Sequence, residues 1–308
     1  MIQVNALRKR YRRVKALDGL NMTVPDGAIY GLIGENGAGK TTTIRILATL
    51  LSPDGGEVQV AGADLLRRPH EARRLIGYMP DFFGVYDDLR VSEYLEFYAA
   101  LHGIRGKAVA TLRDELLELV DLSAKREEYV EHLSRGMQQR LCLARALIHD
   151  PQVILLDEPA SGLDPIARVE MRELLKELGK LGKTIVISSH ILSELADLCT
   201  HVGMMAAGKM IREGPVDEMV WVAGKAGYEL RVLRDGERAA VALQTLEGIG
   251  AVENVDGVVR FHCANGAEDA ARALATVVGA GIPVVRFGEV ENTLEAAFVR
   301  MARKGVSA

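Results

Sequence analysis

The sequence predicts an α/β domain with a largely parallel sheet, followed by a smaller α+β domain. Short apolar runs that end at turn residues alternate with segments of helical periodicity, and this alternation is typical of α/β domains. The run at 153–156 is uninterrupted by polar residues, as in a strand that is buried on both faces of a parallel sheet. From about residue 224 the expected order becomes β-α-β-β-α-β, which is the order of a ferredoxin-like domain. A length of 308 residues is also typical of two domains.

The first domain opens with short strands and continues with helices. Turn sequences at 25–27 and 54–56 separate apolar runs that we interpret as strands. Apolar residues then recur with a helical period, and one of the helices stops before Pro151. In chain order we expect strands at 22–24, 28–33 and 58–60, helices within 90–125 and at 135–149, a strand at 153–156, a helix at 165–181, a strand at 184–188 and a helix at 192–198.

The second domain contains one clear hairpin signal. Asp256-Gly257 lies between two short runs that contain valine, at 252–255 and 258–263. An Asp-Gly pair between two such runs is typical of a tight turn between antiparallel strands. Residues 224–308 carry 10 basic and 11 acidic side chains, so we expect no basic clamp for nucleic acid here. The expected elements are a strand at 228–233, a helix at 237–246, strands at 252–255 and 258–263, a helix at 268–278, a strand at 282–287 and a closing helix at 293–303.

Composition argues against several classes of protein. The chain has 38 Lys and Arg against 42 Asp and Glu, a formal net charge of −4, whereas a general nucleic-acid binder carries a basic excess. The longest uncharged run late in the chain, at 273–285, has 13 residues, and a spanning helix needs about 20. The basic N-terminal run lacks a following apolar segment, so it is not a secretory signal. Three distant cysteines form neither a disulfide framework nor a zinc cluster, which favours an intracellular protein.

The strongest motif is a glycine-rich phosphate loop. It has the form G-x-x-x-x-G-K-[ST] and lies between a predicted strand at 29–33 and an apolar helix at 44–51. Its glycines let backbone N–H groups surround a phosphate chain, next to the positive end of the helix dipole. Lys40 supplies a charge for the β- and γ-phosphates, and the Thr41 hydroxyl is placed to ligate Mg²⁺. The expected nucleotide-binding residues of this loop are Gly34, Glu35, Asn36, Gly37, Ala38, Gly39, Lys40, Thr41 and Thr42.

Two carboxylates, Asp157 and Glu158, follow the buried strand at 153–156. An Asp at this place can hold Mg²⁺, directly or through water, and the adjacent Glu is placed to take a proton from an attacking water. The alternative is an ordinary acidic turn at the end of a strand. With the phosphate loop upstream, the pair favours nucleotide hydrolysis.

Three further segments have both an ordinary and a functional interpretation. Ser134 and Gly136 open a helix, where a hydroxyl and an amide either form a second anion site or simply cap the helix. The segment 161–164, which ends in Asp164, forms a turn after the two carboxylates, and His190 follows the strand at 184–188. The order and spacing of all these segments along one chain favour the functional interpretation.

With these motifs, residues 1–220 resemble the ATP-binding subunit of an ABC transporter. The resemblance implies a P-loop ABC-type domain over residues 1–223, with a mixed sheet, an antiparallel β subdomain and a helical subdomain at about 82–150. It further implies a ferredoxin-like accessory or regulatory domain over 224–308. The corresponding family motifs are Walker A at 34–42, the signature motif at 133–137, Walker B at 153–158 and the D-loop at 161–164.

The resemblance also implies residue roles and partners. Tyr11 would stack on adenine, Glu158 would activate water, His190 would position the γ-phosphate, and Thr41 and Asp157 would hold Mg²⁺ beside ATP. Two subunits, identical or merely similar, would meet head to tail, so that Ser134, Gly136 and Asp164 close on the ATP of the partner. Separate integral-membrane permease subunits would place the chain at the cytoplasmic face of the cell membrane. The C-terminal part resembles the extension of exporter-type subunits for drugs, lipids and polysaccharides, which favours export.

Two positions depart from the family pattern. Asp81 stands where the family usually has Gln, and its carboxylate can still ligate Mg²⁺ but adds a charge beside Glu158. The signature motif reads S-R-G-M where S-G-G-Q is common. Because Ser134 and Gly136 remain, variation within a subfamily is the simpler explanation. An impaired ATPase, or a nucleotide sensor without turnover, is the alternative.

A cluster of aromatic residues predicts a contact surface, since Phe82, Phe83 and Tyr86 lie in a loop with glycine. In ABC subunits this region receives a short helix of the membrane subunit. The competing function is a soluble ABC-type ATPase that acts on ribosomes or nucleic acid. The basic run at 8–15 supports it, whereas the single Walker A motif and the lack of sustained heptads oppose it. The lack of an N-K-x-D motif argues against a GTPase.

Overall fold

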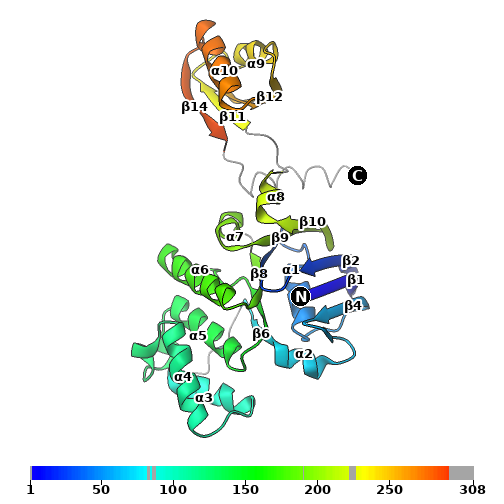
Figure 1. The fold of residues 1–308 in the computed structure, drawn as a ribbon, viewed down its shortest axis with the longest axis vertical. Helices are drawn as coiled ribbons and strands as arrows, with labels where there is room; N and C mark the ends of the chain where they lie inside the picture. Colours follow the sequence, from blue (N-terminus) through cyan, green and yellow to red (C-terminus); the bar gives the residue numbers. More distant parts are fainter. Residues whose placement is uncertain (1, 82–83, 85–87, 190, 222–226, 291–308) are drawn as a thin grey trace. The chain divides into compact units, whose positions relative to one another are not determined.

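A computed structural model describes residues 2–81, 84, 88–189, 191–221 and 227–290 of the chain (Figure 1). The chain divides into two compact units, Met1–Val216 and Asp217–Ala308. Within the described residues, the first unit has two sheets and the second has one, and each unit has its own helices and apolar core. Within the described residues, no helix combines the length and the apolar character that a membrane span needs.

A six-stranded sheet forms the centre of the first unit, with the strand order β10-β9-β3-β8-β7-β6. Five of these strands are parallel, and β10 pairs with β9 in the antiparallel direction at the edge. Every residue of β3, β7 and β8 is buried, which confirms the prediction of a mixed, largely parallel α/β sheet. The bounds are β3 Ile29–Gly34, β6 Ile76–Met79, β7 Val153–Asp157, β8 Thr184–Ser189, β9 His201–Ala206 and β10 Lys209–Pro215.

A second, antiparallel sheet of the same unit shares an apolar core with the central sheet. Its order is β2-β1-β4-β5, and its inward residues, such as Ile2, Leu20 and Val58, share one core with Leu32 and Leu155 of the central sheet. The helix α1 (Lys40–Leu47), which follows the phosphate loop, belongs to the same core. The bounds are β1 Ile2–Tyr11, β2 Val14–Val24, β4 Gly55–Val60 and β5 Ala63–Asp64.

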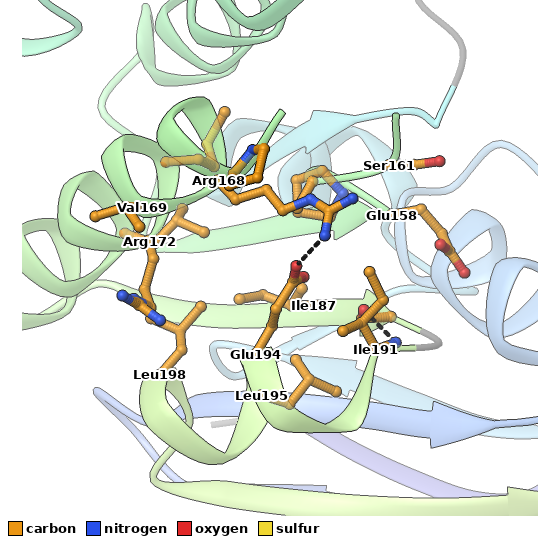
Figure 2. A pocket seen from close by; sticks show the side chains of 16 residues that line it. Glu158, Ser161, Arg168, Val169, Arg172, Ile187, Ile191, Glu194, Leu195 and Leu198 are labelled. Carbon is orange, nitrogen blue, oxygen red and sulfur yellow. Dashed lines mark hydrogen bonds and ion pairs between the residues drawn. The ribbon is translucent and has the colours of Figure 1, made fainter. Parts of the chain in front are cut away.

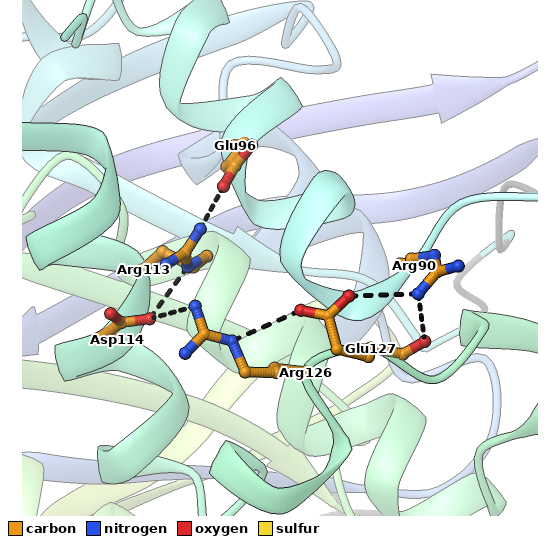
Figure 3. A network of polar contacts seen from close by, with 6 residues as sticks. All are labelled: Arg90, Glu96, Arg113, Asp114, Arg126 and Glu127. Atoms are coloured by element: carbon orange, nitrogen blue, oxygen red, sulfur yellow. Dashed lines mark hydrogen bonds and ion pairs between the residues drawn. The ribbon is translucent and has the colours of Figure 1, made fainter. Parts of the chain in front are cut away.

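The region predicted as helical from residue 90 to 125 contains two helices and a 3₁₀ turn. Gly103 and Gly106 have φ angles of 79° and 69°, and this left-handed backbone separates α3 from α4. Figure 3 shows a chain of ion pairs that joins them: Arg113 contacts Glu96 of α3 and Asp114 of α4, and Arg126 contacts Asp114 at 3.3 Å. The bounds are α3 Val91–Leu101, α4 Lys107–Leu119, η1 Ser123–Lys125, η2 Val130–His132 and α5 Arg135–Leu147.

One helix follows each of the strands β7 and β8. Helix α6 (Pro165–Lys180) begins after an Asp164 cap with proline at its first position, and α7 (Leu192–Leu198) packs against α6 and β3. Two short helices were not predicted from the sequence: α2 (Pro69–Leu75) precedes β6, and α8 (Val216–Trp221) ends the described part before residue 222.

The second unit has a four-stranded antiparallel sheet with the order β12-β13-β11-β14. Its core combines Tyr228, Leu230 and Phe261 of the sheet with Leu243 and Val277 of the helices. The elements follow one another as predicted, although β12 begins earlier and β14 ends later; the predicted closing helix at 293–303 lies outside the described residues. The bounds are β11 Gly227–Val232, α9 Gly236–Gln244, β12 Ile249–Val255, β13 Val258–Cys263, α10 Ala267–Gly279 and β14 Val284–Val290.

Candidate nucleotide site

The phosphate loop connects β3 to α1, as the sequence predicts, and two of its glycines leave no room for a Cβ atom. Gly39 has φ 108°, and a Cβ atom there would lie 2.7 Å from the carbonyl oxygen of Ala16. A Cβ on Gly34 would lie 2.6 Å from the carbonyl oxygen of Met205. The backbone therefore curls closely against its neighbours, and Glu35, Asn36 and Gly37 stay exposed at the tip of the loop.

The N-terminus of α1 is open to an anion. Gly39 caps the helix and brings no side-chain hydrogen bond, and the first turn contains no acidic residue. The first N–H groups of a helix have no partner within it, so Lys40, Thr41 and Thr42 present amide donors at the positive end of the dipole. This geometry suits a chain of phosphates.

Lys40 lies under the loop. The residue is 6% exposed, and its ammonium donates to the carbonyl oxygens of Gly34 at 2.6 Å and Glu35 at 3.3 Å. Burial lowers the pKa of the Lys40 ammonium, while the Glu158 and Asp157 carboxylates oppose that shift. The Lys40 ammonium is thus hydrogen-bonded to the loop and interacts electrostatically with the two carboxylates that follow the buried strand.

Thr41 and Asp157 are brought together, as predicted. The Thr41 hydroxyl donates to Asp157 Oδ1 at 3.1 Å, and Asp157 is 1% exposed. Its second oxygen, Oδ2, is buried and accepts no hydrogen bond from the described residues. An orphaned carboxylate oxygen beside a hydroxyl is a donor set that fits Mg²⁺, which binds through one or two protein oxygens together with phosphate oxygens. In the described part of the chain no three His, Cys, Asp or Glu side chains cluster as an all-protein metal site.

Ser188 bonds the Asp157 carboxylate and the backbone of Glu158, and it was not among the predicted site residues. Its hydroxyl donates to Asp157 Oδ1 at 2.7 Å and accepts from the Glu158 N–H at 3.0 Å. Glu158 has φ 53°, an unusual conformation for a residue with a side chain, and its N–H also points to the Ser188 carbonyl at 3.2 Å. The signal that could have identified Ser188 is a hydroxyl in the neighbouring parallel strand, in register with Asp157.

The signature segment and the D-loop lie against each other within one chain. Ser134 caps α5, and its hydroxyl accepts from the Met137 N–H at 3.3 Å. Gly136 leaves no room for a side chain, since a Cβ would lie 2.9 Å from the Cβ of Ala167. A Cβ on Gly162 would lie 2.5 Å from the Arg135 guanidinium carbon, so the arginine that departs from the family pattern covers the D-loop.

Asp164 is occupied as a helix cap. Its Oδ1 accepts from the N–H groups of Ile166 and Ala167, both at 3.0 Å. Among the described residues, no hydrogen bond joins Ser134, Gly136 or Asp164 to the loop 34–42 of the same chain. A role of these three residues at a nucleotide therefore needs a second copy and stays a prediction.

Of the remaining predicted site residues, the structure describes Tyr11 and Asp81. Tyr11 ends β1 beside a hairpin turn, is 43% exposed, and has the Lys9 ammonium 5.9 Å from its ring centroid. Asp81 follows β6 and is exposed. His190, together with Phe82, Phe83 and Tyr86, lies outside the described residues.

Comparisons with known proteins agree with this geometry. The ABC transporter family model matches residues 17–161, which include the phosphate loop, Asp157 and Glu158. The bacitracin transport ATP-binding protein BcrA of Bacillus licheniformis is 38% identical over 307 residues, 99% of this chain and 98% of that protein. The daunorubicin resistance ATP-binding protein DrrA3 of Streptomyces coeruleorubidus is 38% identical over 250 residues, 80% of this chain and 79% of its own length.

A solved structure has the same fold as the first unit of this chain. The dimeric, post-hydrolysis ATP-binding cassette MJ0796, bound to ADP and Pi, has a TM-score of 0.64 and 26% identity. The likeness covers 70% of this chain and 99% of that cassette. An ATP-binding subunit of an ABC transporter is similar at a TM-score of 0.63 and 29% identity, over 71% of this chain and 91% of its own.

Proposed function

This chain belongs to the ABC transporter family as an ATP-binding and ATP-hydrolysing subunit, and from that premise we propose how its residues use ATP and which partners it serves. The observation that carries the proposal is the contact chain Thr41–Asp157–Ser188, which joins the phosphate loop to the turn of Glu158. It links the place where phosphates bind to the place where a water would be activated.

The phosphate loop holds the triphosphate. Amides at the start of α1 and the Lys40 ammonium meet the phosphate oxygens, with Gly34, Glu35, Asn36, Gly37, Ala38, Gly39 and Thr42 shaping the loop. Thr41 and Asp157 hold Mg²⁺, with Asp81 as a further candidate ligand. When bound, the ion neutralises charge on the phosphates during transfer. The support for this assignment is the buried, unpaired Asp157 Oδ2 next to the Thr41 hydroxyl.

Glu158 is the general base in this proposal. It accepts a proton from the water that attacks the γ-phosphorus, and the bond from that phosphorus to the β–γ bridging oxygen breaks, so ADP and phosphate are formed. Two hydrogen bonds from its N–H to Ser188 hold the turn that presents the carboxylate. His190 then positions the γ-phosphate.

Two copies of the chain, or one copy with a similar subunit, complete each site. The ATP bound by one subunit is approached by three residues of the other, Ser134, Gly136 and Asp164. Tyr11 stacks on the adenine ring of ATP. The dimeric state of the similar cassette MJ0796 supports this arrangement.

Integral-membrane permease subunits are the further partners, and the chain works at the cytoplasmic face of the membrane. The proposal of export rests on relatives whose names refer to bacitracin transport, daunorubicin resistance and Nod factor export. These names favour a transporter subunit over an ATPase that acts on ribosomes or nucleic acid. We propose that residues 1–223 are the motor and 224–308 a ferredoxin-like accessory domain; the sheet order β12-β13-β11-β14 supports the latter.

Affinity purification from detergent-solubilised membranes tests the partner. The tagged chain should retain a protein with about six apolar segments of spanning length, and ATP turnover should rise in the purified complex. Retention of ribosomes or nucleic acid in place of such a protein would favour the competing function.

A further inference from the structure

Strands β1 and β2 are joined by a turn of two arginines, Arg12 and Arg13. Tyr11 pairs with Val14 on either side of the turn, and both arginines are exposed. Arg12 has φ 49°, a left-handed backbone that glycine or asparagine adopts at a lower energetic cost, and these are residues that two-residue hairpin turns prefer. The chain thus keeps two charged side chains at a turn that does not suit them, which points to a role outside the turn itself.

Arginines elsewhere in the same unit have acidic partners. Arg168 of α6 pairs with Glu194 of α7 at 3.4 Å, as Figure 2 shows, and the chain of ion pairs in Figure 3 holds three more arginines. Within the described part of the chain, neither Arg12 nor Arg13 forms an ion pair. Their charges are therefore available to an acidic group of another molecule.

The neighbouring positions add to this positive charge. Residues 8–15 contain six basic side chains and no acidic one. Arg10 lies directly opposite Lys15 in the register of β1 and β2, and like charges at such positions repel each other. Asp18, at 3.5 Å from Lys15, offsets one of these charges. We call the following exposed residues the basic patch: Arg10, Arg12, Arg13 and Lys15.

An acidic patch lies just before the signature segment. Residues 127–131 contain three glutamates and no lysine or arginine, and the first glutamate belongs to the chain of ion pairs in Figure 3. Glu128 pairs with Lys125 at 3.4 Å, but both side chains are exposed, so this pair contributes little to stability. Glu131 is exposed, and its neighbour at 3.6 Å is the His132 ring. We call Glu128 and Glu131 the acidic patch.

The two patches lie on opposite sides of the first unit, so they cannot meet within one copy. In Figure 1, β1 and β2 lie on the side away from α4 and α5, and residues 127–131 connect these two helices. The proposed function brings the patches of two copies together, because Tyr11 of one subunit and Ser134 of the other contact the same ATP. Arg12 follows Tyr11 directly, and Glu131 precedes Ser134 by three residues.

We propose that the basic patch of one copy pairs with the acidic patch of a second, identical copy when ATP closes the dimer; this inference rests on the proposed function. The occupant is a second copy because one chain carries both charges, and a two-fold axis brings each patch opposite its complement in both halves of the dimer. Exposed pairs at the rim of an interface act mainly on the association rate and on the choice of partner. The pairing therefore favours two identical subunits, and it weakens as the salt concentration rises.

Charge reversal in the full chain tests this pairing. The parent is Glu158→Gln, and sedimentation with ATP and Mg²⁺ measures the dissociation constant of its dimer. One variant adds Arg12→Glu and Arg13→Glu, and the other adds Glu128→Arg and Glu131→Arg. Either variant alone places like charges opposite each other, so its dimer should be at least about tenfold weaker. An equimolar mixture of the two should dimerise to within about threefold of the parent, because opposite charges then meet in both halves.

The matched control is Arg67→Glu with Arg74→Glu in the parent. These exposed residues lie at α2 of the same unit, and their reversal changes the net charge by the same amount as that of the arginine turn. This control should dimerise like the parent. Raising NaCl from about 50 mM to about 500 mM should weaken the parent dimer about tenfold, and it should weaken the dimer of Arg12→Ala with Arg13→Ala less.

Three results would overturn the pairing and leave the proposed function intact. They are charge-reversed variants that dimerise like the parent, a mixture that dimerises no better than either variant although each binds ATP, and a salt dependence that the alanine variant does not reduce. A parent chain that binds ATP but stays monomeric would contradict the proposed function instead, and the pairing with it.

Discussion

Ser188 Oγ lies 2.7 Å from Asp157 Oδ1, and this contact connects two neighbouring parallel strands at the point where the carboxylates begin. Both residues are buried, with 0% and 1% exposure. The hydrogen bond fixes the rotamer of Asp157, so that Oδ1 is occupied and Oδ2 remains for a cation. The same hydroxyl accepts from the Glu158 N–H, which couples the proposed metal ligand to the proposed base.

Replacing Ser188 with Ala should lower kcat for ATP roughly tenfold, equivalent to about 1.4 kcal/mol, because two hydrogen bonds that position Asp157 and Glu158 are lost. Steady-state ATPase kinetics measure this. The control is Ser189→Ala, since the Ser189 hydroxyl accepts from the Ile191 N–H and touches neither carboxylate. Equal effects of the two variants would contradict the assigned role of Ser188.

Thr41→Ala should raise the Mg²⁺ concentration needed for half-maximal ATPase activity, since it removes the hydroxyl that we propose as a ligand of Mg²⁺. Thr41→Ser keeps a hydroxyl at the same place and should stay close to wild type. Titration of ATPase activity with Mg²⁺ at fixed ATP measures the difference. An unchanged Mg²⁺ requirement in Thr41→Ala would argue against this ligand.

Gly39→Ala and Gly37→Ala should differ in severity. Both glycines have positive φ, at 108° and 83°, but only at Gly39 would a Cβ atom contact a carbonyl oxygen, at 2.7 Å. Positive φ alone costs a non-glycine residue about 1–2 kcal/mol, so Gly37→Ala should weaken ATP binding modestly and Gly39→Ala should abolish it. Binding of a fluorescent ATP analogue, with thermal unfolding as a check on folding, distinguishes them. Similar affinities would contradict the close packing of the loop.

Stability should fall below neutral pH in part through a pair of histidines. The rings of His102 and His149 are stacked with centroids 4.3 Å apart, and His149 Nε2 lies 2.9 Å from the Ile76 carbonyl oxygen. Burial first, and then the neighbouring His102, lowers the pKa of His149; burial also lowers the pKa of His102. The unfolded chain therefore binds more protons than the folded chain once the pH falls below about 6.5. The contribution of the pair to folding stability is present above that pH and is lost as the pH falls through the lowered pKa values of the two histidines in the folded chain.

The variant His102→Phe tests this pH dependence, because it keeps a stacked ring without a titrating group. Urea denaturation midpoints at pH 7.5 and pH 5.5 should differ less in His102→Phe than in wild type. An equal or larger difference in the variant would show that the pair does not contribute.

The sequence was informative where side-chain chemistry repeats in a fixed pattern. The phosphate loop, the buried run at 153–156 and the helix from Pro165 were predicted close to their observed places because glycine spacing, continuous apolar residues and a capping Asp164 act locally. The pairing of Thr41 with Asp157 followed from the same motif.

Other features depend on contacts between distant segments. The full extent of strand β1 was not predicted, since it carries several exposed basic residues and register shifts that break its alternation, although Leu7 is fully buried. Strands β9 and β10 were missed because short runs with glycine give a weak signal. Ser188 became visible only through its register with Asp157 in the neighbouring parallel strand.

The central claim is that Glu158 completes hydrolysis in a site shared by two copies, and one measurement tests it most directly. Glu158→Gln keeps the size of the side chain and one acceptor oxygen, but its amide cannot take a proton from water. Size-exclusion chromatography with light scattering, in the presence of ATP and Mg²⁺, should show a stable dimer of the variant and almost no phosphate release, whereas wild type should return to monomers as ATP is consumed. A variant that binds ATP but stays monomeric, or that hydrolyses ATP like wild type, would contradict the account.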